Sequence, residues 1–570
     1  MAKYENETLW HSAAHIMAAA VKKLYPKARF GIGPPVENGF YYDIDNISLK
    51  EEDLEKIEKE IKNIIKANLK FERKEVSLSE VKNIFKDEPY KLELIEDRKD
   101  QKLTIYKLGD FIDLCKGPHV KYSKEVKFIK LTKLAGAYWK ADSNNPMLTR
   151  VYGIAFQKKE DLNNYFKLLE EAEKRDHRKL GTQLDLFSVH DETGPGLPLF
   201  HPKGTILFNL MRDYWEDIHK KAGYVLVNTP HVYKLNLWKQ SGHWDNYREN
   251  MFLTEYGGDD FGVKPMNCPG HMYIYNSSSK SYRDFPIRMG EMGVVYRCEL
   301  SGTLSGLFRV IKITQDDAHI FCREDQVESE LKNVIELVFQ IYKDFGFKDF
   351  HIELSTRPEK SIGSDEIWEM AESTLKKVLK SKKIDYQLNP GDGAFYGPKI
   401  DFHIKDALGR SWQCGTLQLD FSMPERFNLT YKGKDNKEHK PVMLHRTIFG
   451  SFERFMGILI EHFAGDFPTW LAPVQARVLS FTDRNIKYGE KIFEELEKAG
   501  IRVEKDFRSD TVQYKVREAE LQKIPYIITV GDKEEESQTL AVRDRSGKVK
   551  FKVKAKDFIK QINKEIESKK

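Results

Sequence analysis

Apolar and polar residues follow each other along the chain in blocks that predict several separate domains. Near the start, the string NETLWHSAAHIMAAAVKKLYP has apolar residues at helical spacing, and the Gly/Pro-rich string GIGPPVENGFYYDID that follows has strand character. Residues 54–70 alternate Glu and Lys, as is typical of a solvent-exposed helix with i,i+4 ion pairs. We therefore expect an α+β domain at residues 1–165 and a linker helix at residues 166–185, where the helical spacing of apolar residues returns.

The pattern changes twice after the linker. Residues 186–470 combine short strand-like runs, amphipathic helices and many Gly/Pro turns, which is typical of a mixed sheet flanked by helices. Residues 471–570 have the order strand, helix, strand, helix, strand, which predicts a small α/β domain with a parallel sheet. A chain of 570 residues is too long for one hydrophobic core, so the sequence predicts a multidomain protein of α/β and α+β type.

Composition narrows the class of protein. Charged residues make up 32% of the chain, and the sequence contains no apolar run that approaches the ~20 residues needed to span a bilayer. The N-terminal string MAKYENETLWHS lacks the apolar segment of a signal peptide, and an odd number of cysteines, five, argues for a reducing compartment. We expect a cytoplasmic protein. A net charge of only +5 means that any RNA contact must come from local basic patches.

Three residues of metal-binding type stand in distinctive strings: Cys268 in KPMNCPGH, His319 in TQDDAHIF and His445 in MLHRTIFGSFERF. They are too far apart in sequence for a local zinc finger, so tertiary folding must bring them together. On residue type alone, a packed cysteine and buried core histidines would be the commoner outcome. Three nitrogen and sulfur donors with a vacant fourth position are nevertheless what a working, non-structural zinc site requires.

Arginines are the candidates for holding a nucleotide, because the sequence contains no G-x-x-x-x-G-K-[ST] phosphate loop. The string VVYRCELSGTLSGLFRV predicts Arg297 and Glu299 on one strand, a Gly/Ser loop, and Arg309 on the returning strand. The string GSFERFMGILIEHF predicts Arg454 at the start of an amphipathic helix. A single arginine more often forms a structural salt bridge, so the case for a nucleotide site depends on the surrounding strings and not on the residue type alone.

These strings resemble the second and third signature motifs of class II aminoacyl-tRNA synthetases. With MNCPGH, TQDDAHIF and HRTIFGSFERF, the chain resembles the threonyl-tRNA synthetase family from about residue 8 to the C-terminus. The resemblance implies a ligase that activates L-threonine with ATP to threonyl-adenylate, transfers it to the 3′ end of tRNA(Thr), and edits mischarged seryl-tRNA(Thr) by hydrolysis. It implies one Zn²⁺ per subunit, Mg²⁺ with ATP, a homodimer, and a form without the ubiquitin-like domain that precedes the editing region in many bacterial relatives.

The resemblance also implies an architecture. An N-terminal α+β editing domain (1–165) and a linker helix (166–185) would precede a class II catalytic domain with zinc and an antiparallel sheet core (186–470). A C-terminal α/β anticodon-binding domain (471–570) would follow.

The resemblance assigns roles to individual positions. Zinc held by Cys268, His319 and His445 would bind the amino group and the hydroxyl of threonine, which valine lacks. The catalytic residues would be Arg297 and Arg454, with His243 and Gln418 for deprotonating the tRNA ribose. Further contacts would be made to the amino acid by Asp317, Tyr396, Lys399 and Gln413, to ATP by Arg297, Glu299, Arg309, Ile313 and Arg454, and to the anticodon by Arg508, Glu534 and Arg543.

Two positions depart from the family pattern. Ile313 stands where an aromatic residue usually stacks on adenine, and Cys298 stands where the family usually has Asn. A branched aliphatic side chain still covers one face of a purine but loses about 1 kcal/mol of stacking energy. We therefore expect ATP binding that is weaker than is usual in the family.

The N-terminal region carries two histidine-containing pairs. His11 and His15 lie four residues apart on one helix face, and Cys115 and His119 have the same separation. The four residues have the composition of a zinc quartet, as in alanyl-type editing domains, but the resemblance favours a metal-free hydrolytic pocket completed by Lys91 and Asp113. Such a pocket is needed because serine differs from threonine by one methyl group, which is worth only about 1–3 kcal/mol. His11 or Lys91 would place a water on the ester carbonyl.

Two other classes of function compete with a ligase. A synthetase-like RNA-binding regulator would have lost catalysis, whereas Arg297, Asp317, Arg454 and the three zinc ligands are intact in this sequence. A zinc hydrolase would need a general base beside the metal, such as the Glu of an H-E-x-x-H helix, and the sequence contains no such motif.

Overall fold

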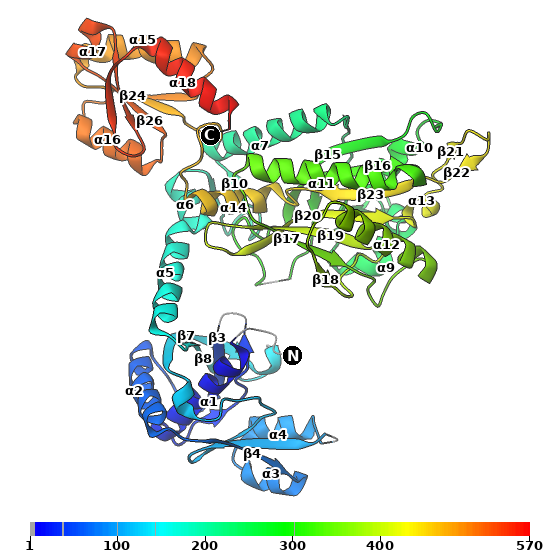
Figure 1. Ribbon diagram of the computed structural model, residues 1–570, viewed down its shortest axis with the longest axis vertical. Coiled ribbons are helices and arrows are strands. Elements are labelled where there is room, and N and C mark those ends of the chain that lie inside the picture. Colours follow the sequence, from blue (N-terminus) through cyan, green and yellow to red (C-terminus); the bar gives the residue numbers. More distant parts are fainter. Residues whose placement is uncertain (1–5, 37–38, 100, 143, 301, 570) are drawn as a thin grey trace. The chain divides into compact units, whose positions relative to one another are not determined.

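The protein forms two compact units, residues 1–170 and 171–570, each with its own hydrophobic core (Figure 1). Within the described part of the chain, every helix is too short or too polar to cross a membrane. The computed structural model describes residues 6–36, 39–99, 101–142, 144–300 and 302–569.

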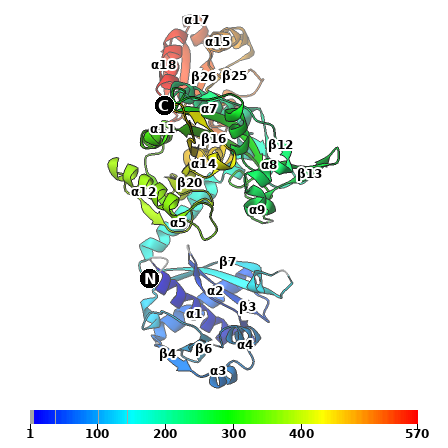
Figure 2. The same ribbon diagram turned by 90° about the vertical axis from the view of Figure 1, so that its right-hand side faces the viewer.

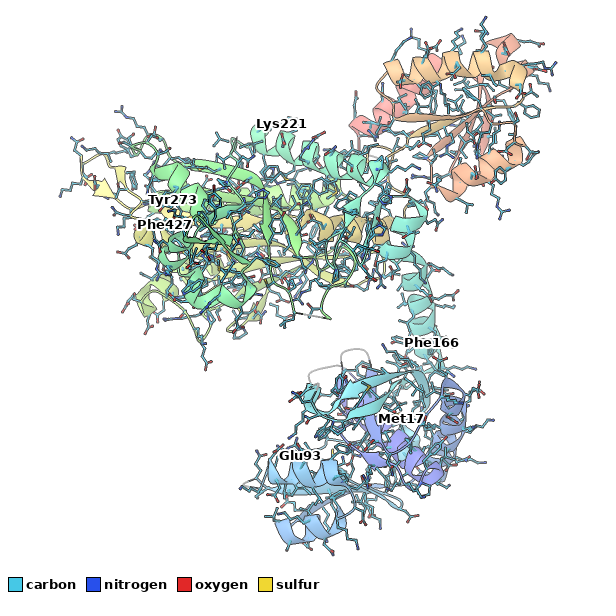
Figure 3. All side chains as sticks on the ribbon, turned by 180° about the vertical axis from the view of Figure 1, so that it is seen from behind. Met17, Glu93, Phe166, Lys221, Tyr273 and Phe427 are labelled. Atoms are coloured by element: carbon cyan, nitrogen blue, oxygen red, sulfur yellow. The ribbon has the colours of Figure 1, made fainter. Side chains whose placement is uncertain are left out.

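Helix α1 is the buried centre of the first unit. Met17, labelled in Figure 3, and the alanines around it are buried where α1 contacts α2 and strands β3 and β8, because small side chains allow a close approach (Figures 2 and 3). The surrounding five-stranded sheet is antiparallel, with the order β1-β3-β8-β7 and β2 beside β3. The bounds are α1 (Glu7–Leu24), α2 (Glu51–Ala67), β1 (Arg29–Phe30), β2 (Pro35–Val36), β3 (Gly39–Asp45), β7 (Phe128–Tyr138) and β8 (Met147–Phe156).

A smaller antiparallel sheet, β4-β5-β6, completes this unit. Helices α3 and α4 connect β4 to β5, and β6 ends just before Cys115. The bounds are β4 (Phe71–Val76), α3 (Leu78–Ile84), α4 (Pro89–Glu96), β5 (Leu103–Leu108), β6 (Phe111–Leu114) and the short helices η1 (Ser123–Glu125) and η2 (Trp139–Ala141).

The predicted single linker helix is two helices, α5 (Lys159–Arg175) and α6 (His177–Gln183). Asp176 separates them because its backbone is non-helical (φ −50°, ψ 117°) and its side chain accepts a hydrogen bond from the backbone N–H of Arg178 at 2.8 Å. The boundary between the two units falls after Glu170, inside α5.

An eight-stranded sheet forms the centre of the second unit, with the order β11-β15-β16-β23-β20-β19-β17-β18. Every neighbouring pair from β15 to β17 is antiparallel, and the two edge strands pair in parallel. Helices α11 and α14 contact β16 (Figure 1), and α7 contacts the edge strand β11. The bounds are α7 (Pro202–Lys221), β11 (Val225–Leu226), β15 (Ile287–Tyr296), β16 (Lys312–Cys322), α11 (Val327–Asp344), β17 (Phe350–Ser355), α12 (Asp365–Ser381), β18 (Gln387–Asn389), β19 (Lys399–Lys405), β20 (Ser411–Asp420), β23 (Val442–Thr447) and α14 (Phe452–Phe463).

Shorter elements surround this sheet. A three-stranded sheet, β12-β14-β13, lies beside α8, and Tyr273 of α10 contacts Phe427 with ring centroids 5.9 Å apart (Figure 3). The bounds are β9 (Phe187–Ser188), β10 (Leu199–Phe200), β12 (Val232–Lys234), α8 (Leu235–Gln240), α9 (His243–Tyr247), η3 (Arg248–Asn250), β13 (Leu253–Tyr256), β14 (Asp259–Val263), α10 (Cys268–Asn276), η4 (Glu324–Gln326), α13 (Met423–Arg426), β21 (Tyr431–Lys432) and β22 (Glu438–His439).

The C-terminal residues form a five-stranded sheet with the order β25-β24-β26-β27-β28. The three predicted strands are confirmed as parallel neighbours, since β24 pairs in parallel with β25 and β26, whereas β27 and β28, which the sequence pattern did not predict, are antiparallel additions after the short helix α17. A parallel neighbour requires a crossover connection of about a dozen residues or more, and the connections 531–539 and 545–548 are shorter than that, so both strands add in the antiparallel direction. The bounds are β24 (Ala476–Ser480), η5 (Asp483–Asn485), α15 (Ile486–Lys498), β25 (Val503–Asp506), α16 (Val512–Leu521), β26 (Tyr526–Val530), α17 (Asp532–Ser537), β27 (Leu540–Asp544), β28 (Val549–Val553) and α18 (Ala555–Glu567).

Candidate functional site

Cys268, His319 and His445 come together beside two inner strands of the central sheet. His319 on β16 lies directly opposite His445 on β23 across the antiparallel ladder, and Cys268 is the first residue of α10. All three side chains are buried, and one donor atom of each lies within 4.8 Å of the other two. The fold therefore places two imidazoles and one sulfur around a common point.

The unused nitrogen of each imidazole has a polar partner. Nε2 of His445 lies 2.8 Å from the Asp420 carboxylate, and Nδ1 of His319 lies 2.8 Å from Nδ1 of His271. His271 in turn contacts the buried carboxylate of Glu291 at 3.0 Å through Nε2. Partners of this kind orient metal-binding histidines and leave the opposite nitrogen available, so the residues present fit a zinc ion with three protein donors.

Burial shifts the protonation of these donors in opposite directions. Burial, with the nearby carboxylates Asp317 and Asp420, raises the pKa of the Cys268 thiol well above its usual range. Burial also lowers the pKa of His319 well below its usual range, and the neighbouring His271 adds to this effect. His319 is therefore neutral at pH 7, which is the form that binds a metal.

A cavity of about 360 Å³, called here the donor cavity, opens beside this trio. Asp317 lines it two residues before His319 on the same strand face, and Asn267 donates a hydrogen bond of 3.1 Å to the Asp317 carboxylate. Tyr396 donates a 2.5 Å hydrogen bond to the side-chain oxygen of Gln418. The cavity is lined by Tyr247, Met266, Cys268, Arg297, Gln315, Asp317, His319, Tyr396, Lys399, Gln413, Thr416, Gln418, His445, Arg446 and Thr447.

Lys399 and Gln413 share one partner in the donor cavity. Lys399 Nζ lies 2.7 Å from one oxygen of Asp401, and the Gln413 amide donates to the other oxygen at 2.8 Å. Asp401 is buried on β19 and also accepts a 3.0 Å hydrogen bond from Thr416. This carboxylate therefore holds both predicted residues in place.

A second cavity of about 530 Å³, called here the arginine cavity, adjoins the first and shares Arg297 and Gln413 with it. Arg454, at the start of α14, donates from Nε to the backbone oxygen of Phe308 at 2.9 Å. Arg309 forms a 2.7 Å ion pair with Glu299. The cavity is lined by Tyr247, Asn250, Arg297, Glu299, Phe308, Arg309, Val310, Ile313, Gln315, Gln413, Cys414, Thr416, Thr447, Gly450, Ser451 and Arg454.

The predicted strand positions of three of these residues are wrong. β15 ends at Tyr296, so Arg297 and Glu299 lie just beyond it, and Arg309 precedes β16, which begins at Lys312. The strand ladder ends there because the intervening Gly/Ser-rich segment turns back through a bridge between Ser305 and Arg309. The three side chains still reach one cavity.

The two departures from the family pattern lie in this region. Ile313 lines the arginine cavity and is 8% exposed, and the Phe308 ring lines the same cavity with its centroid 4.3 Å from that of Trp412. The backbone of Cys298 exchanges hydrogen bonds with Asn250 at 3.0 and 3.3 Å. Weaker binding of ATP stays a prediction.

His243 is fully buried and does not line either cavity. Its Nε2 lies 3.0 Å from the sulfur of Met266, which lines the donor cavity, and its Nδ1 lies 2.8 Å from Ser241. Burial lowers the pKa of His243 to about 3. A neutral imidazole therefore stands behind Met266, whereas Gln418 lines the donor cavity directly.

The first unit brings His11, His15, Cys115 and His119 together, with one donor atom of each within 4.8 Å of the others. The Cys115 sulfur lies 3.3 Å from Nε2 of His11 and 3.2 Å from Nε2 of His119. Burial raises the pKa of the Cys115 thiol to about 12 and lowers the pKa of each histidine below its usual value. The cluster is therefore neutral at pH 7.

Lys91 and Asp113 form a buried ion pair next to this cluster. Nε2 of His15 lies 3.4 Å from the Asp113 carboxylate. The hydroxyl of Tyr42 donates to Asp113 and accepts a 3.0 Å hydrogen bond from Lys91. Sequence reasoning did not assign Tyr42, although it stands in the noted string GIGPPVENGFYYDID.

The three predicted anticodon residues lie on different elements of the C-terminal region: Arg508 after β25, Glu534 on α17 and Arg543 on β27. Arg508 follows the edge strand β25 and pairs with Asp506 at 2.7 Å, whereas Arg543 lies on β27 and donates to the backbone oxygen of Gly547 at 3.0 Å. Three strand spacings separate β25 from β27, which is about 14 Å. The Glu534 carboxylate accepts from the backbone N–H of Gly531 at the start of α17. Their anticodon role stays a prediction.

Three further residues that the sequence did not single out form hydrogen bonds to the predicted site residues. His271 and Asp420 orient the two zinc-type histidines, and Asp401 holds Lys399 and Gln413. His271 belongs to the string MNCPGH, so its position gave a signal. Asp420 and Asp401 are carboxylates in sheet strands, and only the strand pairing reveals what they face.

Three known domain families match separate parts of the chain. Residues 252–463 match the tRNA synthetase class II core domain (G, H, P, S and T), residues 472–565 match an anticodon binding domain, and residues 103–152 match the threonyl and alanyl tRNA synthetase second additional domain. The threonine–tRNA ligase of Clostridium tetani is 53% identical over 566 residues, which cover 99% of this chain and 88% of that protein.

The chain belongs to the threonine–tRNA ligase family. The threonine–tRNA ligase of Thermotoga neapolitana is 54% identical over 564 residues, which cover 98% of this chain and 88% of the relative. A crystal structure of the RNA binding domain of threonyl-tRNA synthetase from Cryptosporidium parvum matches with a TM-score of 0.66 and 39% identity, over 68% of this chain and 98% of that one. These matches confirm the predicted family, enzyme class and fold class.

Proposed function

We propose that this chain activates L-threonine with ATP to threonyl-adenylate, transfers the threonyl group to the 3′ end of tRNA(Thr), and hydrolyses seryl-tRNA(Thr) in its first unit. One observation carries the proposal: the metal-type trio and the arginine-lined pocket belong to adjoining cavities that share Arg297 and Gln413. An amino acid bound beside the trio would have its carboxylate near a nucleotide bound beside the arginines.

Selection of threonine takes place in the donor cavity. Cys268, His319 and His445 would hold one Zn²⁺, which, when bound, supplies a Lewis-acidic position for the amino group and hydroxyl of threonine. The Asp317 carboxylate receives the ammonium group, and Tyr396 and Gln413 line the remaining wall. Valine has the same shape but leaves the hydroxyl position unfilled, so it binds poorly.

Activation takes place between the cavities. A carboxylate oxygen of threonine attacks the α-phosphorus of ATP, the bond between the α-phosphorus and the bridging oxygen breaks, and pyrophosphate leaves with its Mg²⁺. Arg297 neutralises the charge that develops on the α-phosphate, and Arg454 holds the γ-phosphate end. Glu299, Arg309 and Ile313 contact the nucleotide from the same cavity.

Transfer to tRNA requires removal of a proton from the ribose hydroxyl. Gln418 lines the donor cavity and holds that hydroxyl. His243, which lies behind Met266, is the proposed acceptor of the proton. Arg508, Glu534 and Arg543 contact the anticodon, and a homodimer in the cytoplasm completes the proposal.

Editing takes place at the cluster of the first unit. A metal-free hydrolytic pocket is supported by the contacts of Cys115, whose sulfur is already approached by His11 and His119. Lys91, Asp113 and Tyr42 form a buried polar network beside it, which can position a water against the ester carbonyl of a seryl group. His15 contacts Asp113 and completes the network.

The first test measures ATP–pyrophosphate exchange with the purified chain. We expect exchange that depends on threonine and Mg²⁺, that is at least about 100-fold slower with valine, and that is lost in Cys268→Ala together with bound zinc. Metal analysis of the same samples provides the second readout. Exchange that is absent from a zinc-loaded wild-type chain would instead favour the regulator that binds RNA without catalysis.

The editing test measures seryl-tRNA(Thr) that survives incubation with the enzyme. We expect more of it with His11→Ala than with the wild type, while threonine-dependent exchange is unchanged because His11 belongs to the other unit. His190→Ala, an exposed histidine of the second unit, is the control. Equal survival with His11→Ala and wild type would contradict the assignment of this pocket.

A further inference from the structure

His177 is a buried histidine outside both cavities that links three segments of the second unit. It is the first residue of α6 and is 2% exposed. Its Nδ1 lies 2.7 Å from the Glu461 carboxylate of α14, and the same oxygen accepts the backbone N–H of His177 at 3.0 Å. Its Nε2 lies 3.0 Å from the backbone N–H of Leu307.

These contacts define the state of the imidazole. Nε2 accepts a hydrogen bond from a backbone N–H and therefore carries no proton, so Nδ1 carries the proton and donates to Glu461. The second oxygen of Glu461 pairs with Arg410 at 2.5 Å, which holds the carboxylate in place. Both ring nitrogens are engaged, so the nearby group of Asp176, His177 and Glu461 has no donor left on the ring for a metal.

The segment that His177 holds belongs to the arginine cavity. Leu307 is fully buried in the core, and the next residue, Phe308, lines the cavity and packs on the His177 ring with centroids 4.1 Å apart. The backbone oxygen of Phe308 accepts the 2.9 Å hydrogen bond from Nε of Arg454. Arg309 follows directly. The hydrogen bond that the Leu307 N–H donates to His177 thus fixes the residue directly before Phe308 and Arg309 of the cavity wall.

The packing around this bond leaves little space for adjustment. Gly306 has φ +48°, and a Cβ added there would lie 2.2 Å from Nε2 of His177. The backbone can approach the imidazole this closely because position 306 has no side chain. The contact between α6 and the segment before Arg309 is therefore built by two residues together.

We propose that His177 is a positioning residue for ATP: it accepts the Leu307 N–H and so sets the orientation of Phe308 and Arg454 in the arginine cavity. The inference rests on the proposed nucleotide role of that cavity. Loss of the acceptor leaves a buried N–H without a partner, which allows the segment to shift and weakens ATP binding about tenfold. Threonine, bound in the donor cavity, is affected much less.

Two amide variants separate the bonds of His177. His177→Asn keeps a donor near the position of Nδ1 but has no atom near Nε2, whereas the longer side chain of His177→Gln brings its amide oxygen to that position. We expect the KM for ATP to rise about tenfold in His177→Asn and less than threefold in His177→Gln, with the KM for threonine changed less than twofold in both. Calorimetric titration with ATP measures the loss of ATP affinity in each variant directly, without catalysis.

His201→Asn is the matched control, because His201 also pairs with one carboxylate, Asp185 at 2.6 Å, but lines neither cavity. Gly306→Ala pushes the Leu307 segment away from the intact His177 ring, and it is therefore also expected to raise the KM for ATP. The proposal is overturned if Asn and Gln variants bind ATP equally, or if the affinity for threonine falls as much as that for ATP. If the wild type binds ATP but shows no threonine-dependent exchange, the proposed function is refuted. The ATP affinities of the Asn and Gln variants still test the role of His177 in that case.

Discussion

Single residues in the donor cavity depend on partners that lie one contact further out. Glu291 illustrates this, because its buried carboxylate accepts from the backbone and hydroxyl of Thr229, contacts Lys264 at 3.3 Å, and holds His271 at 3.0 Å. His271 then contacts His319. The orientation of one zinc-type imidazole is thus set by a carboxylate on the neighbouring strand β15.

This relay predicts the effect of Glu291→Gln on metal affinity. The amide loses the negative charge that faces Lys264 and is a weaker acceptor for His271, so the His319 ring is held less firmly and we expect zinc affinity to fall about 10–100-fold. Competition with a coloured chelator measures it. Glu330→Gln is the control, since Glu330 is an equally buried carboxylate that pairs with Arg288 at 2.7 Å away from the cavity. Equal losses in the two variants would contradict the relay.

The sequence predicted the individual donors of the site better than their supports. Cys268, His319 and His445 are identifiable because their residue types and surrounding strings carry chemical information. Asp401 and Asp420 carry no such local signal, since a carboxylate in a strand acquires a role only from the strands beside it. His243 shows the opposite case: the resemblance implied a role in deprotonating the tRNA ribose, whereas the fold buries the side chain behind Met266.

At the scale of elements, the start of α14 is tied to β16 by two buried carboxylates. Asp316 of β16 accepts the backbone N–H groups of Ile448, Phe449 and Gly450 at 2.8–3.0 Å, and Glu453 of α14 accepts the N–H of Thr314 at 2.9 Å. Burial raises the pKa of Asp316 to about 6, despite these bonds and the nearby Arg446. Strand and helix therefore form one support beneath Arg454.

The cap of α14 provides a test at this scale. Ser451 accepts the backbone N–H of Arg454 at 3.2 Å, and Ser451→Ala removes this cap. We expect a loss of stability of about 1 kcal/mol and a rise in the KM for ATP, because the first helical turn carries Arg454. Ser364→Ala removes the equivalent cap of α12 and is expected to lower stability without changing the KM for ATP. Thermal unfolding and exchange kinetics measure both; an unchanged KM in Ser451→Ala would contradict the argument.

Element types followed from the sequence more readily than element ends. Residues 54–70 were predicted as an exposed helix, and α2 spans Glu51–Ala67 with Ile57, Ile61 and Ile64 buried. The linker was predicted as one helix and is two. The capping residue Asp176 breaks the helix, but the apolar residues on both sides keep their helical spacing, so the break is not visible in the sequence pattern. In the C-terminal sheet, the three predicted strands pair in parallel as expected, whereas the two antiparallel strands β27 and β28 were not identified from the sequence.

At the scale of the whole molecule, α5 connects two units that have separate cores. None of the side chains of α5, all of which the structure describes, is buried, and its Leu168 is 50% exposed. Leu162, Tyr165 and Phe166 of α5 pack half-buried against the core of the first unit, whereas residues 167–170 are exposed and gain little stability from packing. The chain is thus built from parts that do not depend on a shared core for their stability.

Limited digestion with trypsin tests this construction. We expect the first cuts in α5, for instance after Lys167, and two fragments that each remain folded by circular dichroism. Lys62 of α2 is also exposed but lies on a helix that buries one face, so it is expected to resist cleavage. Initial cleavage within either core, with α5 intact, would contradict two independently stable units.

The sequence by itself determined the family, the enzyme class and the class of fold, because long strings in the family's order are readable along the chain. It also predicted the donor residues, because their chemically distinctive side chains stand within those strings. Tertiary structure decided which of these residues share a cavity, which are withdrawn from it, and which unmarked carboxylates and histidines hold them. The physical reason is that orientation, burial and hydrogen-bond partners arise between strands and helices far apart in the chain, as the contact of His177 with Leu307 shows.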